Sequence, residues 1–299
     1  MAIKGNRTEL LLKHASKSQL GLEIGPYVNP LAPKSEGYNV KILDVFDQET
    51  LLSRASKDPY LSNAAIDRIE SVDFVCGASE IGELVSLAGN ELDYILSSHN
   101  LEHIPDPIRF LKGCLKILKP DGVLSMALPD FRGCWDRFRP LTCTADWLEA
   151  FFQKRTKPTA KQVFVQNSMH CRWQNDGVEL PTMPLSTKVE ELKPLETMER
   201  AYENYLKFSE TEDEMPYLDT HCWTFMPSSF SLLVEDLRHL ALIEFKVMEI
   251  TETLSSEFIV HLKKKPFAEE DRMLFYENRA SLLRGVAAYY EDQLPDDVT

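Results

Sequence analysis

The chain has 299 residues, of which 43% are hydrophobic, which is enough for one large domain with a sizeable core. Its net charge of −14 argues against nucleic acid or an anionic membrane as the main partner. No apolar stretch approaches the ~20 residues that span a bilayer. Residues 1–18 lack the apolar centre of a signal peptide, and the six cysteines form no C-x-x-C pair. We therefore expect a cytoplasmic protein without a structural zinc site.

Apolar runs alternate with helix-like segments over the first 128 residues. We expect strands at 20–24, 39–43, 72–75, 92–96 and 123–128. Helices are expected between them at 8–18, 47–56, 79–88 and 107–118, with Gly89 and Asn90 ending the third. Five strands joined by crossover helices predict a doubly wound α/β sheet.

The alternation stops after Asp130. Residues 131–219 are interrupted by prolines and show no strand–helix rhythm, and the acidic stretch 190–214 is expected to be partly helical. A long insertion at this place is typical of a lid or a substrate pocket.

Regular structure is expected again near the C-terminus. A helix at 228–240, with Ser228 or Ser229 as its N-cap, precedes two antiparallel strands at 242–251 and 257–262. An antiparallel pair of this kind would close a mixed sheet at its edge.

The last segment predicts one long helix. Its apolar side chains recur three and four residues apart, at Met273, Tyr276, Ala280, Leu283, Ala287, Tyr290 and Leu294. Such a stripe forms either a homodimer seam or a contact with the chain's own body, and Gly285 weakens the coiled-coil interpretation.

Two polar segments follow strands of the predicted sheet. One is Leu22-Glu23-Ile24-Gly25-Pro26, and the other runs from Ser97 to Asp106 and reads Ser-Ser-His-Asn-Leu-Glu-His-Ile-Pro-Asp. Ligands bind at the carboxyl ends of strands in such sheets, so these segments predict a small-molecule site.

These segments resemble the class I S-adenosylmethionine-dependent methyltransferases. Glu23-Ile24-Gly25 is similar to the family's acidic-x-Gly loop after the first strand, and Asp44 stands where the family carries a ribose-binding carboxylate. Residues 98–105 are similar to the motif that follows the family's fourth strand.

The resemblance implies a Rossmann-like methyltransferase fold: an α/β, doubly wound, seven-stranded mixed sheet with a long insertion after strand 5 and a C-terminal helix. Residues 1–130 and 220–265 would form the S-adenosylmethionine-binding domain, 131–219 the insertion or substrate lid, and 266–299 the C-terminal helix. Shorter motifs, at 25–37, 128–132 and 219–225, are similar to a bacterial subgroup often encoded beside glycosyltransferases.

The resemblance also implies that S-adenosyl-L-methionine is the cofactor. The residues implied to bind it are Glu23, Gly25, Pro26, Asp44, Val45, Cys76, Gly77, Ala78 and Ser98. Tyr27 replaces the family's second glycine, and Gly77 stands where an acidic partner of the adenine is usual. Asp47 is the better candidate for the cap of the next helix, which leaves Asp44 for the ribose hydroxyls.

Three residues are candidates for catalysis around the acceptor. His99 directly follows the fourth strand. Asp130 is either a substrate contact or general base, or an ion-pair partner of Arg132. His221, in Asp219-x-His221, is either a general base oriented by a carboxylate or a structural cap.

A metal site is not expected from the histidines. His99 and His103 are four residues apart, which is the spacing of a metal pair on a helix, but Pro105 breaks the segment. Glu102 and His103 are expected to brace the loop.

The function implied is methyl transfer to a small or glycan-type acceptor, with O-methylation of a sugar hydroxyl in polysaccharide biosynthesis favoured. The alternative is a catalytically degenerate fold that serves as a binding or scaffold protein. A nicotinamide-dependent oxidoreductase is disfavoured because the first turn lacks G-x-G-x-x-G, and a glycosyltransferase because no Asp-x-Asp metal site is evident.

Overall fold

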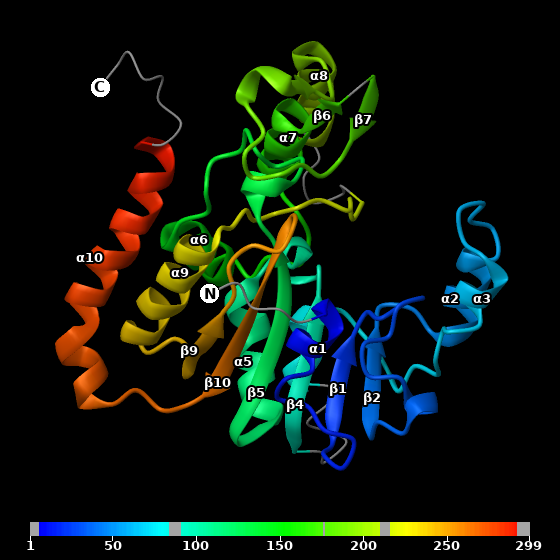
Figure 1. Ribbon diagram of the computed structural model, residues 1–299, viewed down its shortest axis with the longest axis vertical. Coiled ribbons are helices and arrows are strands. Elements are labelled where there is room, and N and C mark those ends of the chain that lie inside the picture. The colour runs from blue at the N-terminus through cyan, green and yellow to red at the C-terminus, as the bar shows by residue number, and fades with distance from the viewer. Residues whose placement is uncertain (1–5, 84–90, 176, 210–215, 292–299) are drawn as a thin grey trace.

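The computed structural model describes residues 6–83, 91–175, 177–209 and 216–291. Its centre is a seven-stranded sheet with the order β3-β2-β1-β4-β5-β10-β9 (Figure 1). The strands are β1 (Gly21–Ile24), β2 (Val40–Asp44), β3 (Phe74–Val75), β4 (Leu92–Ser98), β5 (Leu118–Pro129), β9 (Phe245–Ile250) and β10 (Glu257–Lys264). β10 is antiparallel to both of its neighbours and the other pairs are parallel, so the predicted doubly wound mixed sheet is confirmed.

The register of the sheet brings the predicted ligand-binding ends together. Ile24, the last residue of β1, lies opposite Leu43 of β2 and Ser97 of β4. Gly25 follows with a φ of 60°, a left-handed conformation that glycine adopts without steric cost. The chain therefore turns away from the sheet just where the three strands end side by side.

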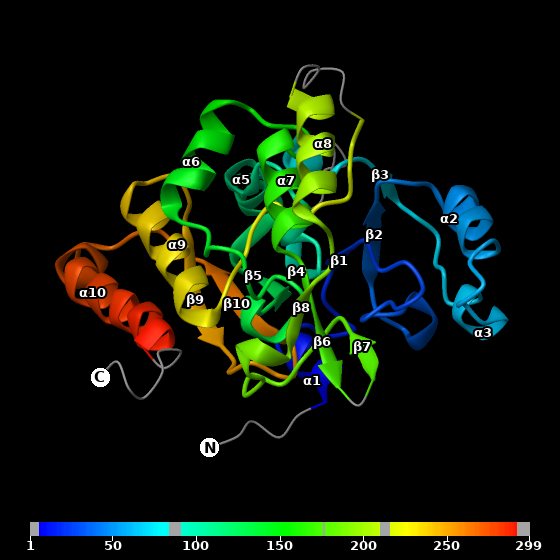
Figure 2. The ribbon, with the colours of Figure 1, turned by 90° about the horizontal axis from the view of Figure 1, so that it is seen from above.

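Side chains that alternate along the strands build a core on each face of the sheet. In β4, Ile95 packs on one face, whereas Tyr94 and Leu96 pack on the other. The first face is covered by α5 (Pro107–Ile117), α6 (Thr144–Phe152) and α9 (Pro227–His239), and the second by α1 (Arg7–Leu11) (Figure 2).

Of the N-caps predicted from the sequence, one is confirmed and one is wrong. Asp47 caps α2 (Gln48–Ala55) as predicted, accepting a hydrogen bond from the Thr50 amide at 2.8 Å. The predicted serine cap of α9 is wrong, because that helix begins one residue earlier, at Pro227, whose fixed φ suits a first helical position. The short helix α3 (Asn63–Ile66) was not expected, and residues 84–90, with the predicted Gly89-Asn90 helix end, lie outside the described residues.

The insertion after β5 contains regular structure that the sequence analysis missed. Besides α6 it holds α7 (Ala160–Met169), α8 (Met198–Ser209) and a three-stranded sheet of β6 (Cys171–Asn175), β7 (Val178–Leu180) and β8 (Leu192–Pro194). Strands of three to five residues are too short to show a period in the sequence. α8 confirms partial helicity in the acidic stretch, of which 210–214 lie outside the described residues. Figure 1 shows α7, α8, β6 and β7 gathered beyond one end of the large sheet.

The C-terminal helix α10 (Glu269–Glu291) packs on α9 through a different face from the predicted stripe. The Phe275 ring stacks on His239 with centroids 3.7 Å apart, and Arg279 Nε lies 2.8 Å from Asp236 Oδ1. Met273 and Tyr276 of the stripe are more than 70% exposed. A homodimer through this stripe stays a prediction, and Leu294 lies outside the described residues. None of the helices that the structure describes combines the length and the apolar composition of a bilayer span.

Candidate functional site

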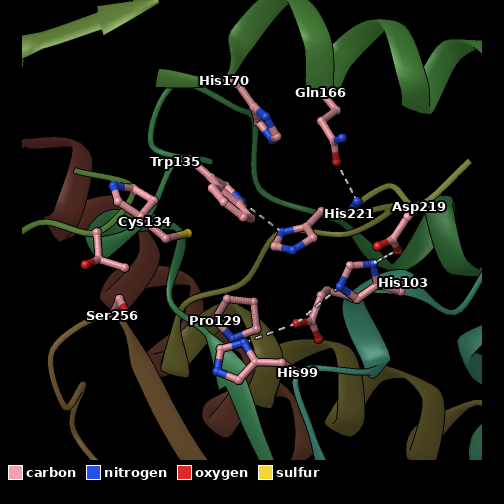
Figure 3. Close-up of a pocket in the computed structure, with 13 residues that line it drawn as sticks. His99, His103, Pro129, Cys134, Trp135, Gln166, His170, Asp219, His221 and Ser256 are labelled. Carbon is pink, nitrogen blue, oxygen red and sulfur yellow. Dashed lines mark hydrogen bonds and ion pairs between the residues drawn. The ribbon is translucent and has the colours of Figure 1, made fainter. Parts of the chain in front are cut away.

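Two cavities of similar size open at the carboxyl ends of the central strands. The first, about 520 Å³, is named the β1 cavity and is lined by residues that include Glu23, Gly25, Pro26 and Ser98. The second, about 530 Å³, is named the insertion cavity and lies between the strand ends and the insertion (Figure 3). His99 lines both cavities, so a group held in one can meet a group held in the other beside this residue.

Glu23 projects from β1 into a cage of backbone amides. Its two carboxylate oxygens accept hydrogen bonds from the amides of Leu31 at 2.7 Å and Ala32 at 3.0 Å, and the side chain is buried. Burial raises the pKa of Glu23 to about 7 despite these two bonds. Its charge can therefore change close to neutral pH.

The loop after β1 keeps a glycine-like path without the family's second glycine. Apart from Gly25 and its two chain neighbours, no described residue has an atom within 4 Å of the position that a Cβ on Gly25 would take, so the backbone is open toward the β1 cavity. Tyr27 adopts a φ of 46°, in the left-handed region. Tyr27, which stands in place of a glycine, therefore has a backbone conformation that glycine favours.

The remaining predicted cofactor residues lie at the ends of β2 and β3. Asp44 is buried, which raises its pKa, and its Oδ1 accepts a hydrogen bond from the Phe46 amide at 3.1 Å. Val45 is exposed, and the Cys76 amide donates to the Asp44 carbonyl at 3.0 Å. The residues at these two strand ends, next to the β1 cavity but not among its described lining, are Asp44, Val45, Cys76, Gly77 and Ala78.

His99 is held by carboxylates on both sides. Its Nε2 lies 2.7 Å from Glu257 Oε2, and its Nδ1 lies 3.4 Å from Glu102 Oε1. Burial alone lowers the pKa of His99, but the two carboxylates outweigh it and raise this pKa to about 9. His99 is therefore a cation near neutral pH and does not accept a proton there.

The neighbouring Ser98 is tied to the N-terminal helix. Arg7 Nη2 donates to Ser98 Oγ at 2.6 Å, and Arg7 Nε lies 2.5 Å from Glu257 Oε1. α1 thus contributes an arginine to the β1 cavity that the sequence analysis did not single out.

Asp130 adopts the ion-pair arrangement left open by the sequence. It is fully buried, and its carboxylate binds Arg132 Nη2 at 2.6 Å and also the Thr253 hydroxyl. It is not among the described residues that line either cavity, whereas the preceding Pro129 lines the insertion cavity.

His221 is oriented by a carboxylate, but the predicted partner, Asp219, is wrong. His221 Nδ1 lies 2.6 Å from Asp136 Oδ2, whereas Asp219 Oδ1 lies 2.8 Å from His103 Nδ1. Because an ionised carboxylate only accepts hydrogen bonds, Nδ1 of His221 carries a proton in this contact, and in the neutral ring the lone pair is on Nε2. Asp136 comes from a distant part of the chain, so no local spacing indicated it.

Asp136 is fully buried at the centre of a charge cluster. Its Oδ1 lies 2.7 Å from Arg139 Nη1 and 3.4 Å from His170 Nε2. Burial alone raises its pKa, but Arg139 and the histidines hold the pKa well below the usual range. Asp136 therefore remains ionised and keeps His221 in one orientation.

Aromatic rings form another wall of the insertion cavity. Trp135 and His170 stack with ring centroids 5.5 Å apart and an interplanar angle of 28°. His103 meets His221 edge to face at 4.7 Å. Figure 3 shows His221 between Trp135 and His103, with His99 on the strand side of the cavity. The cavity thus offers a flat apolar wall and a group of polar side chains.

Part of the chain matches a family model and shorter segments match curated relatives. Residues 19–126 match a family model described as a methyltransferase domain. The chain is similar to a ubiquinone biosynthesis O-methyltransferase of Parvibaculum lavamentivorans, at 29% identity over 80 residues, which are 26% of this chain and 30% of that protein. A protein of the same description from Neisseria meningitidis is 25% identical over 85 residues, 28% and 32% of the two chains. The match therefore spans about a third of the length of these relatives.

A solved structure shows likeness over a larger part of the chain. An S-adenosylmethionine-dependent methyltransferase from Methanosarcina mazei aligns with 86% of this chain and 98% of its own, at a TM-score of 0.40 and 15% identity. The family match over residues 19–126 and the observed strand order confirm the predicted methyltransferase fold. The matched domain contains the β1 cavity's Glu23, Gly25 and Ser98.

Proposed function

We propose that this chain transfers a methyl group from S-adenosylmethionine to a hydroxyl of a small or glycan-type acceptor, with a sugar hydroxyl as the specific target. The observation that carries the proposal is the place of His99, which joins a cavity in the methyltransferase domain to a second cavity bounded by the insertion. Oxygen as the accepting atom is supported by the two relatives described as O-methyltransferases.

The donor would lie along the ends of β1, β2 and β3. The β1 cavity would take the methionine part, with Glu23 facing its ammonium group and the open backbone at Gly25 beside it. Asp44 would accept hydrogen bonds from the ribose hydroxyls, and residues 76–78 would border the adenine. The sulfonium methyl would then point past Ser98 and His99 into the insertion cavity.

The reaction is a displacement at the methyl carbon. The bond from sulfur to the methyl group breaks, the bond from the acceptor oxygen forms, S-adenosylhomocysteine leaves and the hydroxyl loses its proton. Alignment of the two reactants contributes most of the acceleration, about 7–11 kcal/mol in well-oriented systems. His221 is the residue that we propose activates the hydroxyl, because its orientation is fixed by Asp136 and its Nε2 is not used by that contact.

The proposal is tested by incubating the chain with methyl-labelled S-adenosylmethionine and a panel of sugar and phenol acceptors. Label on a sugar oxygen supports it. Label on phenols alone would keep methyl transfer and overturn the sugar acceptor. Binding of S-adenosylhomocysteine without transfer to any member of a broad hydroxyl panel would favour a binding role.

Replacing Asp44 by alanine is expected to weaken S-adenosylhomocysteine binding about 10- to 100-fold, because hydrogen bonds to a charged group contribute about 1.5–3 kcal/mol. Asp47→Ala is the matched control. It removes a carboxylate three residues away that caps α2, so it should lower stability slightly and leave the affinity unchanged. Calorimetric titration of both variants measures this, and equal affinities would remove Asp44 from the site.

The pKa of Glu23 predicts a pH-dependent affinity for the donor. At pH 6 this carboxyl is mostly protonated and at pH 8 mostly ionised, since its pKa is raised to about 7. Only the ionised form attracts an ammonium group, so S-adenosylhomocysteine should bind about tenfold more tightly at pH 8 than at pH 6. The Glu23→Gln variant should bind weakly at both pH values. A wild-type affinity that is flat across this range would contradict the assignment.

A further inference from the structure

Three side chains in the insertion cavity converge in a way that methyl transfer alone does not require. Glu102 and His103 belong to a 3₁₀ turn, Leu101–His103, directly after β4, and His221 belongs to the segment before α9. Each offers one ligand atom, and these atoms all lie within 4.8 Å of one another. We propose that Glu102, His103 and His221 bind a divalent transition-metal ion.

Glu102 provides independent support, because its charge is buried without compensation by hydrogen bonds. The residue is 0% exposed, and neither carboxylate oxygen has a hydrogen-bond partner among the described residues. His99 Nδ1 lies 3.4 Å and His103 Nε2 lies 3.9 Å from Oε1, and neither makes a hydrogen bond to it. Burying a carboxylate without hydrogen bonds is costly even beside the cationic His99, and a bound cation would supply the missing contacts.

Both histidines are arranged as metal-binding histidines usually are. His103 Nδ1 lies 2.8 Å from Asp219, and His221 Nδ1 lies 2.6 Å from Asp136. A carboxylate on one ring nitrogen fixes the tautomer and leaves the lone pair on the other nitrogen for the ion. His221 therefore has the hydrogen-bonded outer carboxylate that orients a ligand, and His103 has a carboxylate close to its Nδ1.

The ligand set indicates the kind of ion. Two imidazoles and one carboxylate suit zinc, cobalt, iron or manganese, whereas magnesium and calcium prefer oxygen ligands alone. Three protein ligands also leave coordination positions open for an oxygen of the acceptor.

The role of the ion in the reaction rests on the proposed function, but its binding does not. A bound ion lowers the pKa of a hydroxyl that it coordinates. The hydroxyl would then lose its proton to solvent, and His221 would act as a ligand and not as the proton acceptor. The sequence disfavours a metal pair of His99 and His103 on one helix. The structure instead places His103 beside His221, which comes from a distant segment.

A second cluster in the molecule serves as the matched control. His14, Glu249 and His261 also lie within the same distance of one another. However, Lys13 Nζ forms an ion pair with Glu249 at 2.5 Å, and the Ser125 hydroxyl is hydrogen-bonded to His261 Nδ1 at 2.8 Å. Because Lys13 and Ser125 already contact two of its three members, this cluster is not expected to bind an ion.

The test is titration of metal-stripped full-length chain with Co²⁺, followed by visible absorption, and with Zn²⁺, followed by calorimetry. We expect one ion per chain in the wild type and in Glu249→Gln. Affinity should fall at least about tenfold in Glu102→Gln and His103→Gln. Asp219→Asn, which keeps all three ligands and changes an exposed side chain, should weaken binding about 10- to 100-fold.

Two results would overturn the metal site: no ion bound by folded wild type, or undiminished binding by folded Glu102→Gln. If Glu102→Gln does not fold, an unchanged affinity of Asp219→Asn for the metal ion would also overturn the metal site. S-adenosylhomocysteine titration of the same samples separates the two proposals. If the chain binds the ion but no donor, the methyl-transfer proposal is wrong and the metal site stands. If it binds the donor but no ion, the metal site is wrong and the methyl-transfer proposal stands.

Discussion

Replacing Asp136 by asparagine is expected to lower the free energy of unfolding by about 3–5 kcal/mol, because it leaves a buried guanidinium without its counter-ion. Arg139 is 5% exposed, and its Nη1 lies 2.7 Å from Asp136 Oδ1. Arg139 and His221 bind different oxygens of Asp136, and asparagine keeps only one acceptor oxygen, so the loss reports on the charge together with one of these two contacts. Urea unfolding followed by circular dichroism measures the change.

Asp219→Asn is the control for this effect. Its side chain is 80% exposed and pairs with His103, so its loss should cost no more than about 1 kcal/mol. If the two variants lost stability equally, the Asp136 cluster would not be the buried anchor that its geometry indicates. A double-mutant cycle of Asp136→Asn with Arg139→Met would then locate the coupling.

The second large effect is expected on turnover. His221→Ala should lower kcat about 10²- to 10⁴-fold, the range typical of groups that activate a reacting hydroxyl. This loss is expected whether Nε2 of His221 accepts the proton of the hydroxyl or binds a metal ion, because alanine lacks this nitrogen. S-adenosylhomocysteine affinity should not change, since His221 lines the insertion cavity and not the β1 cavity.

His239→Gln provides the comparison for the loss of a histidine. His239 packs on Phe275 of α10 and is not among the described residues that line either cavity, so kcat should stay within about twofold of wild type. Intact turnover in His221→Ala, with donor and acceptor affinities unchanged, would be incompatible with the proposed role. Loss of S-adenosylhomocysteine affinity in this variant would instead mean that the two cavities are coupled.

Much of the sheet could be predicted because its signals are local. Apolar runs of four to six residues, most of them followed by a glycine or a polar residue, indicate the central strands, and the residues after Asp47 indicate it as a helix cap. The carboxyl ends of β1 and β4 follow from chain order in a doubly wound sheet, so Glu23, Gly25 and Ser98 could be placed at one edge before the structure was known.

What could not be predicted depends on contacts between distant segments. The partner of His221 is Asp136, and the partner of His99 is Glu257 as well as the nearby Glu102. No spacing in the sequence indicates pairs that form only when the insertion folds back over the strand ends. The face of α10 that packs inward could not be predicted for the same reason, because it is set by the stacking of Phe275 on His239 of α9.

Calorimetric titration of the wild-type chain with S-adenosylhomocysteine is the decisive test of donor binding at the strand ends beside the insertion cavity. We expect one molecule bound per chain with micromolar affinity. If the correctly folded chain bound no S-adenosylhomocysteine, the donor site would be wrong and the fold would serve as a binding or scaffold module.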